Sequence, residues 1–117
     1  MTAPPRIAPK PWGHEELWAA GPGYVGKILL IWAGHRLSLQ HHERKVETLR
    51  VLRGEVACTV GPSVDALAER VLGPGDVLHL PAGWVHRLRA ITEVEIVEVS
   101  TPELDDVVRH ADDYGRL

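Results

Sequence analysis

Short apolar stretches alternate with segments rich in glycine and proline along the chain, at a spacing of about ten residues. The most apolar stretch is Tyr24 to Trp32. Lys27 is its only charged side chain, so it predicts a strand buried on both faces. Many short strands of this kind predict an all-β sandwich or barrel in a single domain, residues 1–117. The other expected strands are residues 15–20 (at an edge), 47–53, 55–60, 77–80, 84–90 and 92–99; residues 63–69 fit either a helical turn or a hairpin loop.

Residues 38–54 concentrate side chains that can bind metals. Side chains two positions apart on a strand share a face, so Gln40 and His42 point one way and His41 points the other. A charged turn follows, and Glu47 then opens the next strand on an apolar face. Such a hairpin would bring Gln40, His42 and Glu47 into one cluster.

A second segment supplies a further histidine. Glycine and proline at 73–76 and 81–83 predict two turns, with one short strand between them and another after them. Within residues 84–90, His86 shares a face with apolar side chains, and both arginines fall on the other face. His86 is therefore expected to face the interior.

These two segments resemble the paired motifs of the cupin superfamily. The first motif is Gly, five residues, His-x-His, three or four residues, Glu, six residues, Gly. Here it runs from Gly34 to Gly54, with Gln40 in place of the first histidine. The second motif is Gly, five residues, Pro-x-Gly, two residues, His, and here it runs from Gly75 to His86. The resemblance implies a cupin jelly-roll barrel.

More narrowly, the chain resembles the cupin module of type II mannose-6-phosphate isomerases and small stand-alone cupins similar to them. Gln40 is shared with that group, as are residues 10–13, residues 34–40 and the tail pattern of residues 105–116. Two features depart from it. The bifunctional enzymes carry a nucleotidyltransferase domain before the module. They also typically read Arg-x-Glu-His-Trp where this chain has Lys-Val-Glu-Thr-Leu at residues 45–49.

The resemblance implies a metal site formed by Gln40, His42, Glu47 and His86. Two imidazoles, a carboxylate and an amide oxygen suit one divalent ion of Zn, Mn, Fe, Ni or Co, with no thiolate to favour a softer metal. Four protein ligands leave positions open on an octahedral ion, as a catalytic metal requires. The remaining histidines are interpreted as structural: His14, His35, His41, His79 and His110.

The resemblance further implies aldose–ketose isomerisation of a small-molecule sugar or sugar phosphate such as mannose 6-phosphate. Lys27 and Glu98 are the candidate catalytic bases, because each is a charge in an apolar strand where burial would tune its pKa. The alternative for each is an outward position or a buried ion pair. Arg36 and Lys45 are candidates for binding the substrate phosphate, with solvated turn charges as the alternative.

Two other functions stay open from the sequence. One is a non-catalytic sugar-binding or regulatory cupin, which the departures from the isomerase group favour. The other is an Fe(II) cupin dioxygenase, because a pair of histidines with one carboxylate is a known iron-binding set. Its ligands would be His42, Glu47 and His86.

Composition narrows the class of protein. A formal charge of −3 does not favour nucleic-acid binding, and no apolar run approaches the roughly 20 residues that span a bilayer. Cys58 is the only cysteine and the N-terminus lacks an apolar signal core, so a cytoplasmic protein is expected.

The two ends of the chain and one outer surface suggest how it assembles. Residues 1–11 contain four prolines and predict an extended arm, and residues 101–117 predict a tail that packs on the barrel. A homodimer is expected, formed sheet to sheet or by exchange of the arm. The residues expected at its surface are Thr48, Arg50, Leu52 and Val60.

Overall fold

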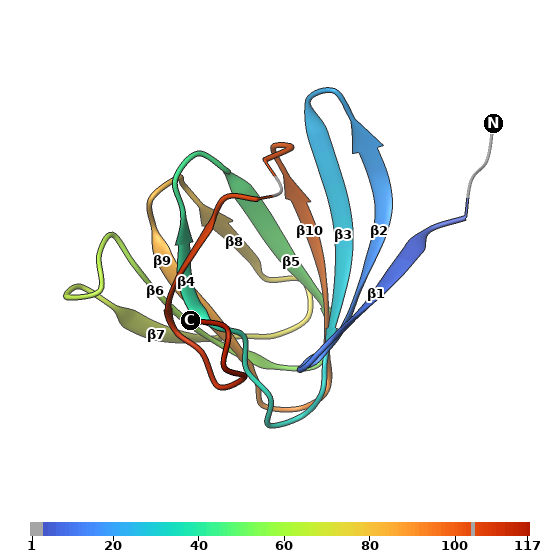
Figure 1. The fold of residues 1–117 in the computed structure, drawn as a ribbon. Coiled ribbons are helices and arrows are strands. Elements are labelled where there is room, and N and C mark those ends of the chain that lie inside the picture. Colours follow the sequence, from blue (N-terminus) through green and yellow to red (C-terminus); the bar gives the residue numbers. More distant parts are fainter. Residues whose placement is uncertain (1–3, 104) are drawn as a thin grey trace.

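The computed structural model describes residues 4–103 and 105–117, and within them the chain forms strands and no helix (Figure 1). No helix is therefore present in these ranges that could cross a membrane. The strands are β1 (Arg6–Lys10), β2 (Gly13–Gly21), β3 (Tyr24–Ile31), β4 (Leu39–His42), β5 (Glu47–Arg53), β6 (Val56–Gly61), β7 (Ala68–Leu72), β8 (Val77–Leu80), β9 (Val85–Ala90), β10 (Val94–Ser100) and β11 (Val107–Ala111).

The strands build two antiparallel sheets that pack face to face. One sheet has six strands in the order β1-β2-β3-β10-β5-β8, and the other has five in the order β11-β4-β9-β6-β7. Both sheets also pair strands that are distant in sequence, such as β3 with β10 and β4 with β11, as in a jelly roll. The predicted all-β jelly-roll architecture is confirmed.

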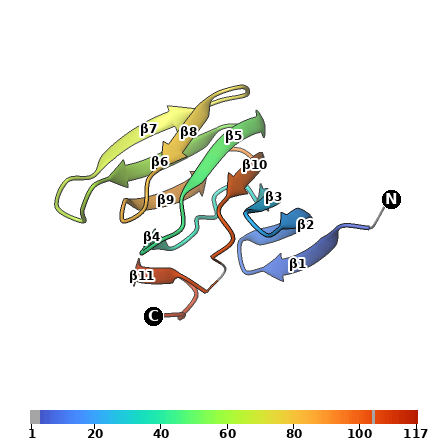
Figure 2. The ribbon, with the colours of Figure 1, turned by 90° about the horizontal axis from the view of Figure 1, so that it is seen from above.

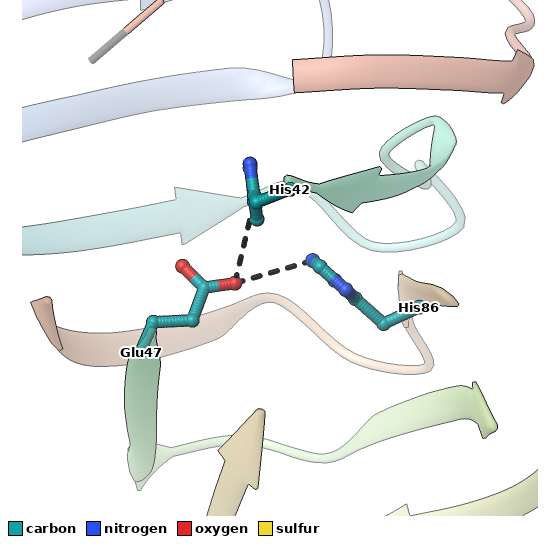
Figure 3. A group of neighbouring side chains, drawn as sticks. All are labelled: His42, Glu47 and His86. Atoms are coloured by element: carbon teal, nitrogen blue, oxygen red, sulfur yellow. Dashed lines mark ion pairs between the residues drawn. The ribbon is translucent and has the colours of Figure 1, made fainter. Parts of the chain in front are cut away.

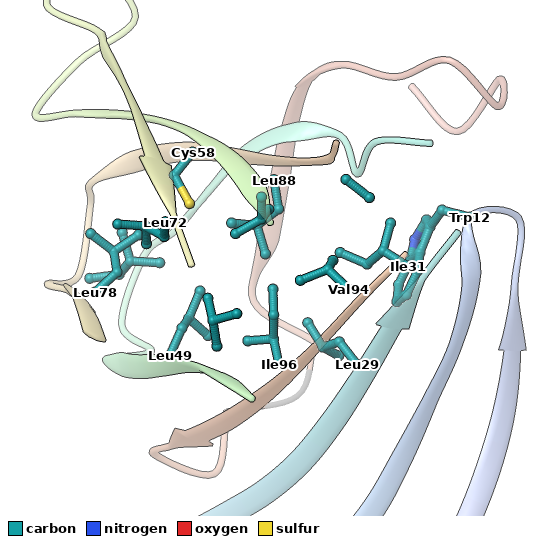
Figure 4. Close-up of a cluster of buried hydrophobic side chains, with 14 residues drawn as sticks. Trp12, Leu29, Ile31, Leu49, Cys58, Leu72, Leu78, Leu88, Val94 and Ile96 are labelled. Carbon is teal, nitrogen blue, oxygen red and sulfur yellow. The ribbon is translucent and has the colours of Figure 1, made fainter. Parts of the chain in front are cut away.

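The hydrophobic core fills the space between the sheets (Figure 4). Because side chains alternate along a strand, one face of each sheet supplies this core. Leu29 of β3 lies opposite Ile96 of β10, and Ile31 lies opposite Val94; all four are almost completely buried. Each such side chain stabilises the fold by about 1.5–3 kcal/mol when it leaves water. The facing sheet contributes Val56, Cys58, Leu88 and Ala90.

Only one face of β3 is buried, which corrects the prediction of burial on both. Leu29 and Ile31 point into the core, whereas Ile28 and Leu30 are only half-buried. The strand ends at Ile31, and Trp32 is 44% exposed. The reason is that a two-layer sandwich covers only the inner face of each sheet. An apolar run alone does not show which faces are covered.

The proline-rich N-terminal segment includes an edge strand. β1 pairs with β2, with Arg6 opposite Leu17 and Lys10 opposite Gly13, so β2 is not the edge strand that the sequence predicts. Pro9 lies within β1, where an edge position tolerates a residue without a backbone N–H. Residues 1–3 of the predicted arm lie outside the described residues.

Besides β1, two strands lie outside the sequence prediction, and both are at the edges of the five-stranded sheet. β7 pairs with β6 after a turn at residues 62–67, so the hairpin alternative for residues 63–69 is the correct one. β11 pairs with β4, so the C-terminal tail adds a strand to the sheet. Neither strand shows clear apolar alternation, because edge strands of this sheet bury few side chains.

The backbone conformation at position 54 requires a glycine, and Gly54 is the last glycine of the first motif. Its φ is +83°, a region that residues with a side chain rarely adopt. A Cβ at this position would also lie 2.2 Å from the carbonyl oxygen of Glu93. The glycine therefore allows the turn between β5 and β6 to pass close to the segment before β10.

The residues expected at a dimer surface separate into two groups. Arg50 and Leu52 are exposed on β5, and Thr48 on the same face is half-buried. Val60 instead packs against the hydrophobic core, so its assignment to an outer surface is wrong. The reason is strand parity, because Val60 shares the inner face of β6 with Val56.

Candidate metal centre

Three of the predicted ligands converge between the two sheets (Figure 3). His42 ends β4 and His86 lies on β9 in the five-stranded sheet, whereas Glu47 opens β5 in the facing sheet. Glu47 Oε1 lies 3.2 Å from His86 Nε2 and 3.6 Å from His42 Nε2. All three residues are buried, and a ligand atom from each lies within 4.8 Å of the others.

The hydrogen-bond partners of the two imidazoles fit a bound cation. His42 Nδ1 lies 3.3 Å from the carbonyl oxygen of Asp106, and His86 Nδ1 lies 3.1 Å from that of Trp84. A ring that donates its Nδ1 proton to a carbonyl keeps a lone pair on Nε2, as metal-binding histidines do. His42 Nε2 is buried without a hydrogen-bond partner among the described residues, and its 3.6 Å distance to Glu47 is too long for one. One divalent cation would satisfy these atoms.

Gln40 lies next to this cluster. It pairs in register with His86, so the two side chains share the inner face of the sheet. Its amide oxygen accepts a 2.6 Å hydrogen bond from the hydroxyl of Ser38. Gln40 also lines the cavity described below. Its role as a fourth ligand stays a prediction.

His41 faces away from the cluster, as strand alternation predicts. Its Nδ1 lies 2.8 Å from Nε2 of His110, and the two rings stack with centroids 5.0 Å apart. Its Nε2 lies 3.0 Å from a carboxylate oxygen of Glu43. The contact with His110 connects β4 to β11, and the interpretation of His41 as structural stays a prediction.

Two buried glutamates lie close together with opposite pKa shifts. Burial opposes ionisation of Glu47, but the nearby imidazoles of His42 and His86 and the charge of Lys45 outweigh it and keep the pKa of this carboxyl well below its usual range. Burial and the nearby charge of Glu47 raise the pKa of Glu98 to about 8. Lys45 Nζ lies 3.1 Å from a Glu47 oxygen and 3.4 Å from a Glu98 oxygen. One carboxylate is thus fixed in its charged form beside one that favours the protonated form, a pattern typical of acid–base sites.

A cavity of about 550 Å³ opens beside these residues, within the roughly 300–1,000 Å³ typical of small-molecule sites. β1 and β11 both line it, and Figure 2 shows these two strands at the same open side of the sandwich. Trp12 and Leu29 of the core form part of its wall. Its charged lining residues are Arg6, Lys10, Glu15, Lys27, Lys45, Glu47, Glu98, Arg109 and Arg116.

Both candidate bases face this cavity. Lys27 of β3 lies directly opposite Glu98 of β10, and both side chains line the cavity wall. Lys27 Nζ lies 3.2 Å from Glu15 Oε1, so Lys27 is also in the ion pair that the sequence left as its alternative. Glu98 lies next to Glu47, one of the predicted metal ligands.

The two phosphate candidates have different positions. Lys45 lines the cavity, where its ammonium group contacts two carboxylates. Arg36 lies outside the cavity lining and makes a bidentate ion pair with Asp113 at 2.6 and 2.8 Å. The sequence reasoning missed Arg109 and Arg116, which line the cavity from the tail. Their only signal is the tail pattern, which predicts packing on the barrel and no contact with substrate.

Asp106 connects the tail to the turn between two of the ligands. Its carboxylate accepts hydrogen bonds from the backbone N–H groups of Glu43, Arg44 and Lys45 at 3.2, 2.7 and 2.8 Å. Its own carbonyl oxygen faces the ring of His42. Asp106 therefore fixes the geometry of the segment that joins His42 to Glu47.

Asp106→Ala is expected to lower metal affinity about 10- to 100-fold, the usual effect of losing a contact that orients a ligand. It should also lower Tm, because three backbone donors lose their acceptor. Metal titration calorimetry and thermal melting measure the two effects. Asp105→Ala is the control, since Asp105 is the exposed neighbour. Equal losses in both variants would contradict this role for Asp106.

Known proteins resemble this chain in sequence over most of its length. A mannose-1-phosphate guanylyltransferase of Escherichia coli strain K12 is 32% identical over 113 residues, covering 92% of this chain and 23% of that protein. The alginate biosynthesis protein AlgA of Pseudomonas aeruginosa is 30% identical over 112 residues, covering 92% and 22% respectively. The chain thus spans less than a quarter of the length of these curated relatives.

Solved structures are similar in fold. KdgF from a Halomonas species matches with a TM-score of 0.75 at 19% identity, over 86% of this chain and 88% of that chain. Oxalate decarboxylase from Bacillus subtilis matches with a TM-score of 0.81 at 14% identity, over 91% of this chain and 30% of that chain. The family model of the cupin domain matches residues 28–100, a range that includes all four predicted ligands. Together with the two-sheet fold and the buried ligand cluster, this match shows that the chain belongs to the cupin domain family.

Proposed function

We propose that this protein is a metal-dependent aldose–ketose isomerase acting on a sugar or sugar phosphate, with mannose 6-phosphate and fructose 6-phosphate as the first pair to test. The position of Glu98 carries the proposal. It is a buried carboxyl next to Glu47, on the wall of the cavity that His42 also lines. Isomerisation needs a group that moves a proton between adjacent carbons, and the position of Glu98 beside the proposed metal ligands supports this role.

The proposed metal ligands are His42, Glu47 and His86, with Gln40 as the fourth. When bound, one divalent ion of Zn, Mn, Fe, Ni or Co supplies a Lewis acid that stabilises negative charge developing on the substrate carbonyl oxygen. The protein fixes these ligands before substrate arrives, since all three described ligands are buried and both histidine rings contact backbone carbonyls.

The protons balance without any oxidant. A C–H bond breaks at carbon 2 of the aldose and another forms at carbon 1, while a hydroxyl proton moves from oxygen 2 to oxygen 1. In this proposal the ionised form of Glu98, which its raised pKa makes a stronger base, accepts the carbon-bound proton and returns it to the neighbouring carbon. Lys27 lies opposite on β3 and is the alternative carrier, while Lys45 holds Glu98 and Glu47 in place through its two ion pairs.

The relatives support a phosphorylated sugar as substrate class. The Escherichia coli relative is named for guanylyl transfer to mannose 1-phosphate. Because the match covers 23% of that protein, its whole activity is not transferred to this chain. The chemical class of its substrate agrees with the cavity, which has cationic side chains in its wall.

Deuterium exchange at carbon 2 is the direct test. Metal-loaded protein and mannose 6-phosphate in D₂O should give deuterium at this carbon, visible by NMR, together with fructose 6-phosphate. Metal-free protein is the control and should give neither. A metal-loaded protein that exchanges no proton from any hexose phosphate or free aldose would rule out the isomerase.

One observation favours a second candidate. His42, Glu47 and His86 by themselves form the two-histidine, one-carboxylate set of Fe²⁺ oxygenases. Oxygen consumption that depends on added Fe²⁺ would support that function. Binding of metal and sugar without proton exchange or oxygen consumption would support a non-catalytic sugar-binding or regulatory cupin.

A homodimer formed through the outer face of the six-stranded sheet belongs to the same proposal. Leu52, Val77 and Val99 are about half exposed on three adjacent strands of that sheet. Sedimentation at micromolar concentration should show two associated chains, and Leu52→Glu should separate them by placing a charge at the interface. A wild-type monomer under these conditions would refute the dimer.

The cytoplasmic location and the lack of nucleic-acid binding stay predictions.

A further inference from the structure

The cavity wall carries an excess of positive charge although the whole chain has a formal charge of −3. Six lysines and arginines line it, against three glutamates. Four of the six have acidic partners: Lys10 and Lys27 contact Glu15, Lys45 contacts Glu47 and Glu98, and Arg116 contacts Asp112. The other two, Arg6 and Arg109, make no ion pair with any described residue.

Arg109 differs from Arg6 because it is half-buried. Arg6 is exposed on the edge strand β1, whereas Nε of Arg109 is buried and finds no hydrogen-bond partner in the described part of the chain. A guanidinium group stays charged at any physiological pH, so it cannot lose its charge to avoid this situation. A buried charged donor without a partner is costly, and an anion in the cavity would supply the missing acceptor.

Strand register places Arg109 in line with the metal centre. Arg109 pairs with Gln40 of β4, and Gln40 pairs with His86 of β9. Directly opposed residues of antiparallel strands point to the same face, so these three residues form one row on the inner face of the sheet. Because neighbouring strands lie about 4.8 Å apart, the backbone of Arg109 is about 10 Å from that of His86. This separation leaves room for several carbon atoms between the metal ligands and the guanidinium group.

We propose that Arg109 binds the anionic group of an open-chain sugar, a phosphate monoester or a carboxylate, whose carbonyl end lies at the metal ligands. The position of the carbonyl end rests on the proposed function. The planar guanidinium fork suits two parallel hydrogen bonds to either anion. Arg109 takes the role that the sequence assigns to Arg36, since Asp113 occupies the Arg36 guanidinium. The C-terminal strand β11 then selects anionic sugars over neutral ones.

Calorimetric titration of the metal-loaded full chain tests this selection, with mannose 6-phosphate, mannuronate and free mannose as probes. Mannose 6-phosphate or mannuronate should bind at least tenfold more tightly than mannose, and the tighter of the two identifies the anion. Arg109→Met should weaken binding of that anion about 10- to 100-fold and leave mannose unchanged, because it removes charge-assisted hydrogen bonds only. Arg109→Lys keeps the positive charge but loses the guanidinium fork. Its affinity for the anion should lie between those of the wild type and Arg109→Met.

Arg89→Met is the matched control, because Arg89 is exposed and its nearest carboxylate is Glu69 at 3.9 Å. Metal content and Tm are measured for every variant. Unchanged affinity of Arg109→Met for both anionic sugars would overturn the inference; if that variant does not fold, unchanged affinity of Arg109→Lys would do so. If the protein binds an anionic sugar through Arg109 but does not turn it over, the proposed anion site is supported and the proposed isomerase function is contradicted. If replacing Arg109 does not change turnover, the proposed anion site is contradicted and the proposed isomerase function is supported.

Discussion

His42→Ala is expected to remove the bound metal almost completely, whereas His41→Ala should leave it in place. His42 Nε2 points at Glu47 and His86 in the buried cluster, while His41 stacks on His110 on the opposite face of β4. The comparison is stringent because the two histidines are adjacent in sequence. Elemental analysis after purification without added metal should show about one equivalent per chain in the wild type and in His41→Ala, as expected for one ligand set per chain.

The stability of the variants is the control for this experiment. His42 is buried, so its removal leaves a cavity and is expected to lower Tm. His42→Gln is the second variant, because it keeps much of the side-chain volume while it replaces the imidazole nitrogen. Full metal content in His42→Ala, or equal loss in His41→Ala, would show that the assignment of faces on β4 is wrong.

Glu98→Gln is expected to lower turnover of mannose 6-phosphate by roughly 10²- to 10⁴-fold, the usual contribution of a general base, while metal content stays unchanged. The amide has nearly the same shape as the carboxyl but does not accept a proton from carbon. Steady-state kcat and the rate of deuterium exchange at carbon 2 measure the loss. Lys27→Met is measured in parallel, and the residue whose replacement causes the larger loss is the proton carrier.

Glu95→Gln is the matched control for Glu98→Gln. Both glutamates lie on β10, but Glu95 is opposite Arg53 of β5 and does not line the cavity. Its replacement should leave kcat within experimental error of the wild type. Turnover that survives in both Glu98→Gln and Lys27→Met, with metal bound, would contradict proton transfer by either residue.

The sequence contains enough information to predict the architecture and the centre of the site. Period-two alternation assigns His42 and His86 to inner faces, and both are buried in the structure. It also assigns Val94, Ile96 and Glu98 to one face of β10, and all three are buried. These predictions succeed because the face of a side chain on a strand is a local property that follows from its position in the alternation.

Predictions that depend on neighbouring strands were less reliable. β2 is not an edge strand because β1 pairs with it, and β3 has only one buried face because the described residues form no third layer on its outer side. β11 has little apolar alternation, yet it completes the five-stranded sheet beside β4. Which strand lies at an edge depends on pairing between segments far apart in the chain, and local composition carries little of that information.

Two arginines show most clearly which properties follow from the sequence and which follow only from the tertiary structure. The sequence determined that Arg36 and Arg109 are cations that can bind an anion, since that property belongs to the side chain. Only the tertiary structure decided their partners: Arg36 meets Asp113, which is 77 positions away, while Arg109 is placed in line with Gln40 and His86. The energy of a charge depends on the groups within a few ångströms of it. In this protein the sheet pairings decide which groups those are, because they bring β1 and β11 from opposite ends of the chain to one cavity.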